Sequence, residues 1–100
     1  MTERKVRFTR TAARHVRNEH AWWLANRDYQ EPFPVALQEA ITLLGALPGA
    51  GSAYDRTPVS GLRRVYARTL GCHLYYTFTE TEVIVRAFWP ARREHGPRLR

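Results

Sequence analysis

Cysteine is almost absent from this sequence, with Cys72 the only one in 100 residues. A single cysteine excludes an internal disulfide and a multi-cysteine zinc site, and it suits a reducing compartment. Long apolar runs are also absent, because the longest, at residues 40–50, is interrupted by threonine, proline and glycine. The first ten residues carry five charged side chains and no apolar stretch, unlike a secretory signal. We therefore expect a cytoplasmic protein without a membrane segment.

Lysine is equally scarce, since the sixteen basic residues comprise fifteen arginines and one lysine. Against nine acidic residues they give a formal net charge of +7. The charge is uneven, with +4 over residues 1–28, −2 over residues 29–60 and +5 over residues 61–100. Arginine grips phosphate and carboxylate groups through paired hydrogen bonds, so this distribution predicts an anionic partner at the C-terminal half.

The composition is otherwise that of one folded domain. Hydrophobic residues make up 44% of the chain and aromatic residues 12%, which is enough for one modest hydrophobic core. No internal repeat or low-complexity segment interrupts it. We expect a single domain over residues 1–100 and exclude a multidomain enzyme.

Two periodicities divide the chain. Residues 5–9 alternate basic and apolar side chains, which predicts a short strand. Apolar residues then recur at three- and four-residue spacing over residues 11–28, which predicts a helix with Thr9 or Thr11 as its N-cap. A break at residues 29–33 precedes a second predicted helix, which begins at Pro34 and ends before a loop at residues 49–61.

The last third of the chain has the two-residue period of strands. It predicts strands at residues 62–68, 72–79 and 82–89, joined by turns that form two hairpins in series. The predicted order is therefore β-α-α-β-β-β. This is an α+β fold with two helices packed on one face of a small, mainly antiparallel sheet.

This order, together with three short segments, resembles the RelE/ParE superfamily of toxins from bacterial type II toxin-antitoxin systems. The segments are Gly-Leu-Arg at residues 61–63, Tyr-Tyr at residues 75–76 and Arg-Ala-Phe-Trp-Pro-Ala-Arg-Arg at residues 86–93. The resemblance covers nearly the whole chain. It implies a toxin that is neutralised by a small acidic antitoxin, and it allows two activities: cleavage of mRNA on the ribosome, as in RelE-like members, or poisoning of DNA gyrase, as in ParE-like members.

The RelE-like activity requires an arginine cluster and a proton-transfer group, because RNA cleavage without a metal must move protons and stabilise the phosphorane. By the resemblance, Arg63 and either Arg92 or Arg93 occupy the positions of catalytic arginines, and His95 is a candidate acid. Several family features are missing. Residues 52–60 hold one basic residue, the tail has no tyrosine, and Trp-Pro stands at residues 89–90 where many members have His-Gly.

These departures favour a ParE-like toxin, a non-enzymatic inhibitor that binds DNA gyrase. The alternative is a ribosome-dependent mRNA endonuclease that uses Arg63, Arg92, Arg93 and His95. A nucleic-acid-binding domain of another kind is also compatible with the charge, although no array of stacking aromatics is evident in the sequence.

The predicted strand at residues 82–89 has apolar residues on both faces. Val83, Val85 and Ala87 suit the face covered by helices, whereas Ile84 and Phe88 flank Arg86 on the other. Because an open sheet face would be polar, we expect this face to be covered by the antitoxin or by a second copy of the chain. The residues predicted to bind the antitoxin or target are Trp22, Arg63, Ile84, Arg86, Phe88, Trp89, Arg92 and Arg93. A structural role for Arg63 and Arg86, paired with Glu80 or Glu82, remains an alternative.

The remaining aromatic and histidine residues support no cofactor. Adjacent tryptophans on a helix point about 100° apart, so Trp23 is expected in the core and Trp22 partly exposed, over the second helix or as a partner anchor. His15 and His20 are five residues apart, which is not the spacing that places two ligands on one helix face. We expect no metal site and no cofactor.

Overall fold

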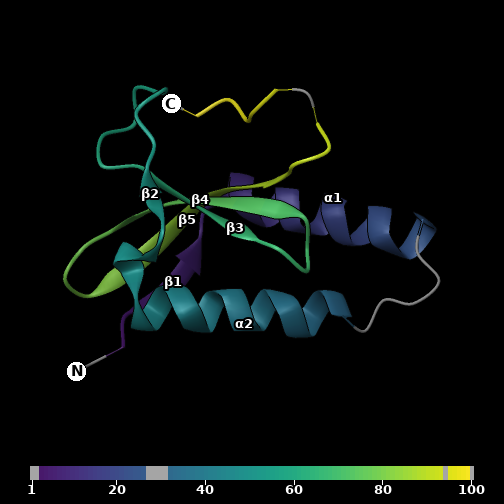
Figure 1. The fold of residues 1–100 in the computed structure, drawn as a ribbon, viewed down its shortest axis with the longest axis horizontal. Coiled ribbons are helices and arrows are strands. Elements are labelled where there is room, and N and C mark those ends of the chain that lie inside the picture. Colours follow the sequence, from purple (N-terminus) through teal and green to yellow (C-terminus); the bar gives the residue numbers. More distant parts are fainter. Residues whose placement is uncertain (1–2, 27–31, 94, 100) are drawn as a thin grey trace.

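The computed structural model describes residues 3–26, 32–93 and 95–99. Its elements in chain order are β1 (Lys5–Phe8), α1 (Arg10–Asn26), α2 (Pro32–Ala46), a short 3-10 helix η1 (Pro48–Ala50), β2 (Ser52–Ala53), β3 (Arg63–Ala67), β4 (Cys72–Phe78) and β5 (Glu82–Pro90). The sheet order is β1-β5-β4-β3-β2, in which β1 runs parallel to β5 and the other pairs are antiparallel. Figure 1 shows α2 on one side of the sheet and the C-terminal segment on the other.

The predicted α+β fold is confirmed. Thr9 is the N-cap of α1, because its side-chain oxygen accepts a hydrogen bond of 3.1 Å from the backbone N–H of Ala12. The second helix begins at Pro32, two residues before the predicted start. The last two residues of the first predicted helix, 27–28, and residues 29–31 of the predicted break lie outside the described residues.

The main core lies between the sheet and the two helices. Leu44 and Phe33 of α2 and Trp23 of α1 are buried there against alternate residues of the central strands. Those strand residues are Cys72, Leu74, Tyr76, Val83, Val85 and Phe88. Burial raises the pKa of the Cys72 thiol to about 12, so this cysteine is an unreactive core residue.

A β-bulge at Arg86 changes which residues of β5 face the helices. Tyr75 pairs with Ala87 and Tyr76 pairs with Val85, so Arg86 has no partner residue on β4. One extra residue shifts the alternation of side chains by one position. The prediction for the end of this strand is therefore wrong: Phe88 lies in the helix-side core, and Ala87 lies on the far face.

The segment predicted as a loop at residues 49–61 contains the last two residues of η1 and the two-residue strand β2. The turn between β3 and β4 places Gly71 at a φ of +66°, in the left-handed region that favours glycine. The two hairpins thus form where the turn residues predict them.

Candidate functional site

A cavity of about 480 Å³ lies between α1, the end of β5 and the C-terminal segment. Helix α1 contributes Arg14, His15 and Glu19, and the chain after β5 contributes four more charged or titratable side chains. Those four are Arg92, Arg93, His95 and Arg98. Among the described residues the cavity therefore gathers four arginines and one carboxylate, and it brings together three of the four residues predicted for the nuclease.

Arg92 is held by an acidic residue of α1. Its two terminal nitrogens donate hydrogen bonds of 2.7 and 3.0 Å to the two carboxylate oxygens of Glu19. The Glu19 side chain is only 3% exposed. The Arg92 guanidinium also lies 3.7 Å from the ring centroid of Trp22. Arg92 thus joins the end of β5 to α1, and its charge is neutralised within the fold.

The remaining arginines of the cavity have no carboxylate partner in the described part of the chain. The Arg93 guanidinium lies over the ring of Trp89 at 4.6 Å, and Arg14 and Arg98 have no hydrogen bond or ion pair there. The indole N–H of Trp89 donates a hydrogen bond of 2.7 Å to the backbone carbonyl of His95, which ties the C-terminal segment to β5. The site as a whole is cationic.

His15 is a functional candidate that the sequence did not reveal. Its Nδ1 accepts a hydrogen bond of 3.2 Å from the backbone N–H of Phe88, and its ring meets Trp89 edge-on at 5.2 Å. Burial lowers the pKa of His15, and the charges of Arg14 and Arg93 lower it further. The imidazole is therefore neutral at pH 7 and carries its proton on Nε2, because Nδ1 is an acceptor. With Nδ1 engaged by the backbone, the Nε2–H of this neutral histidine can donate a hydrogen bond to an anion.

Arg63 is not part of this cavity. It pairs with Tyr76 in the sheet register, and its guanidinium donates hydrogen bonds to the backbone carbonyls of Gly49 and Gly51 beside η1. Because residues directly opposite in an antiparallel pair share a face, Arg63 lies on the helix side of the sheet. Its neighbour Arg64 lies on the far face, over the rings of Tyr54 and Tyr75 at 5.0 and 5.9 Å.

Tyr76 fixes the same turn from within the core. Its hydroxyl donates a hydrogen bond of 2.7 Å to the carbonyl of Pro48 and accepts one of 2.9 Å from the N–H of Gly51. Tyr76→Phe leaves both backbone groups without this partner, so we expect a loss of about 2 kcal/mol of unfolding free energy in urea titration. Tyr66→Phe is the matched control, since that side chain is 50% exposed, and it is expected to change stability by less than about 0.5 kcal/mol. Equal losses in the two variants would contradict this role of the buried hydroxyl.

The far face of the sheet carries Ile84 and Arg86. The Arg86 Nε donates a hydrogen bond of 2.9 Å to the Thr77 hydroxyl, so its partner on the sheet is not an acidic residue. Glu82 pairs instead with Arg7 at 3.2 Å. Ile84 is 8% exposed, so little of it is available to a partner.

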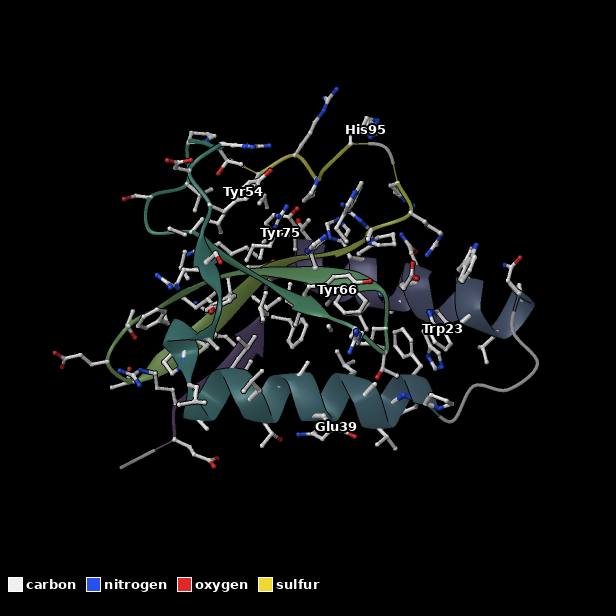
Figure 2. The ribbon with its side chains drawn as sticks, in the orientation of Figure 1. Trp23, Glu39, Tyr54, Tyr66, Tyr75 and His95 are labelled. Carbon is white, nitrogen blue, oxygen red and sulfur yellow. The ribbon has the colours of Figure 1, made fainter. Side chains whose placement is uncertain are left out.

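Much of the far face is covered by the chain itself. Tyr75 and Ala87 pack with Leu62 from the loop before β3, and Val59 and Leu99 pack against this cluster. Figure 2 shows Tyr54 and Tyr75 between the sheet and the C-terminal segment that carries His95. The expectation that a second molecule must cover this face is therefore wrong for the part that the loop and tail occupy.

The same face carries an aromatic cluster that the sequence pattern does not predict. Tyr54 and Tyr75 meet edge-on at 5.1 Å, and Tyr66 lies 4.9 Å from His73. Tyr54 directly follows β2, Tyr66 lies on β3, and His73 and Tyr75 lie at alternate positions of β4, so these residues are neighbours only once the sheet has formed. Within the described residues, no helix is long and apolar enough to span a membrane, and no three potential metal ligands lie together.

Comparison with known proteins supports the fold through structure and not through sequence. No family model and no curated protein sequence matches the chain. A chain of the chromosomal ParDE TA system from P. aeruginosa superimposes with a TM-score of 0.61 at 15% identity, over 88% of this chain and 96% of that one. A chain of the E. coli DinJ-YafQ toxin-antitoxin complex gives a TM-score of 0.62 at 15% identity, over 94% and 99%. The chain therefore has the RelE/ParE-like fold that the sequence resemblance predicts.

Proposed function

We propose that this protein is the toxin of a type II toxin-antitoxin system, active in the cytoplasm and silenced by a cognate acidic antitoxin. The likeness in fold to chains of the ParDE and DinJ-YafQ systems, over nearly their full length, supports this function. The net charge of +7 suits an acidic partner. Of the residues predicted to contact that partner, Trp22, Arg86, Trp89, Arg92 and Arg93 keep exposed surface, whereas Phe88 is fully buried.

The target of the proposed toxin is DNA gyrase, which it inhibits by binding and without a catalytic step. The observation that carries this choice is the position of Arg63. A nuclease of the RelE type needs its arginines at one phosphate, but the guanidinium of Arg63 is bonded to the turn at η1 on the helix side of the sheet. Arg92 and Arg93 lie in the cavity beside α1, away from that turn.

The second candidate is a ribosome-dependent mRNA endonuclease, and the cavity favours it. There His15 is neutral and lies near Arg14 and Arg93. In such a reaction a base removes the proton of a 2′-hydroxyl, whose oxygen attacks the adjacent phosphorus, and the bond to the 5′-oxygen breaks as that oxygen gains a proton. His15 is not that base, because its Nδ1 accepts a hydrogen bond from Phe88 and its Nε2 carries the proton, but its Nε2–H can donate a hydrogen bond to the phosphate. Arginines stabilise the charge of the intermediate. His95 at the same cavity is a candidate acid for the departing oxygen.

One experiment separates the two targets. The protein is expressed under a tight promoter with primer extension on a highly translated mRNA, and the purified protein is added to gyrase supercoiling and DNA-cleavage assays. We expect growth arrest, intact message and loss of supercoiling or trapped cleavage complexes. Co-expression of an acidic protein encoded beside this gene is expected to restore growth.

Variants of the cavity make the result specific. His15→Gln and Arg93→Gln test the nuclease, with Arg68→Gln as a control of equal charge change that lies in a groove beside α2. Cuts at defined codon positions that disappear in His15→Gln, but not in Arg68→Gln, would replace gyrase by mRNA as the target. If expression leaves growth unaffected, the proposal that this protein is a toxin is contradicted.

A further inference from the structure

Three arginines that have no acidic partner among the described residues line the cavity between α1 and the C-terminal segment. Arg14 comes from α1, Arg93 from the chain after β5 and Arg98 from the C-terminal segment. Glu19 is the one carboxylate among the described lining residues, and both of its oxygens are engaged by Arg92. Three like charges in one concave site repel one another, and the repulsion is relieved when an anion enters.

We propose that this cavity binds a phosphate group, held by Arg14, Arg93 and Arg98. Guanidinium groups donate hydrogen bonds in a planar fork, and a phosphate offers enough oxygen atoms to accept from several forks at once. Thr11 and Asn18 of α1 line the same cavity and supply neutral donors. The volume of about 480 Å³ also leaves room for the atoms that carry the phosphate.

The pKa of His15 is expected to change when an anion occupies this cavity. The His15 ring lies at the cavity wall, and the charged and titratable groups that line the cavity come from three segments: Arg14 and Glu19 of α1, Arg92 and Arg93 after β5, and His95 and Arg98 of the C-terminal segment. The nearby positive charges of Arg14 and Arg93, after burial itself, keep the pKa of His15 low. A bound phosphate stabilises the imidazolium, so it is expected to raise that pKa.

Two sources supply the same chemistry: a small phosphate compound, or the backbone of a nucleic-acid strand. The cavity is open to solvent and lies beside the aromatic ring of Trp89, so its shape admits either source. The proposal of a phosphate site does not depend on whether the toxin acts on gyrase or on mRNA. It is tested by phosphate binding alone.

The test is an NMR titration of the full chain with inorganic phosphate, followed through the His15 ring and the backbone amides of residues 11–19, 95, 96, 98 and 99. We expect saturable shifts at these residues and a higher pKa of His15 with phosphate bound. Arg14→Gln and Arg98→Gln are each expected to weaken binding about tenfold. Arg68→Gln has the same change in charge outside the cavity and is expected to bind as the parent does.

A parallel arm uses a mononucleotide and a single-stranded oligonucleotide as probes. If the cavity variants weaken the oligonucleotide more than the mononucleotide, the phosphate belongs to a nucleic acid; if both weaken alike, it belongs to a small compound. Either result supports the site. Shifts spread over all basic residues, an equal loss in Arg68→Gln, or binding at the cavity by a glutamate-rich peptide and not by phosphate would overturn it.

Discussion

Phe88→Ala is expected to lower the free energy of unfolding by about 4 kcal/mol, measured by urea or thermal denaturation. The side chain is fully buried, and its ring meets that of Phe33 edge-on at a centroid distance of 6.1 Å. Removing it deletes a large apolar surface and leaves a cavity between β5 and α2. For a chain of this length such a loss lowers the melting temperature by roughly 20 °C.

Phe78→Ala is the matched control. That phenylalanine is on β4 at 39% exposure, and its replacement is expected to cost about 1 kcal/mol. The comparison decides between two interpretations of residue 88. If Phe88→Ala kept the stability of the parent and lost only its affinity for the antitoxin, Phe88 would be the surface contact that the sequence predicts, and its burial in the core would be contradicted.

The bulge explains why the sequence predicts most of the sheet and fails at its end. Val83 and Val85 follow a two-residue period, and this is enough to place them against the helices. Beyond Arg86 the same alternation continues in the sequence, so Ala87 and Phe88 fit either face equally well. An inserted residue leaves no compositional mark here, because the unpaired position is filled by an ordinary strand residue.

The helices were predictable because their signals are local. Thr9 lies three residues before the amide that it caps, and the apolar spacing repeats along α1 and α2. The cavity depends instead on contacts between distant segments. His15 bonds to Phe88, and Glu19 bonds to Arg92, each across 73 positions of the chain. No periodicity encodes such pairs, so the sequence predicted Arg92, Arg93 and His95 by resemblance alone and missed His15.

The position of Arg63 was also beyond the reach of local sequence signals. The resemblance selects Arg63, but neighbours on a strand point to opposite faces, so the sequence does not say whether Arg63 or Arg64 lies on the far face. Only the register, which pairs Arg63 with Tyr76 and Arg64 with Tyr75, decides between them. The coverage of the far face by Leu99 was hidden for a similar reason, because a tail without periodic structure carries no signal of where it packs.

Arg92→Met is expected to lower the free energy of unfolding by about 3 kcal/mol, because it leaves the carboxylate of Glu19 buried without its cation. The value lies at the lower end for a broken buried pair, since the Arg92 side chain is 39% exposed and water can replace part of its role. Arg93→Met removes the same charge one position later. It is expected to cost less than about 1 kcal/mol, because Arg93 contacts the Trp89 ring and no described carboxylate.

A second substitution tests the cause. Adding Glu19→Gln to Arg92→Met removes the buried negative charge that has lost its partner. The double variant is expected to recover more than half of the lost stability in the same denaturation experiment. If the double variant were as unstable as Arg92→Met, the loss would come from packing against Trp22 and not from the ion pair. The result also bears on the function of the cavity. If Arg92→Met abolishes toxicity, the loss is evidence for a nuclease only when the variant protein remains folded. His15→Gln and Arg93→Gln are cleaner tests of the cavity, because they leave the pair of Arg92 and Glu19 intact.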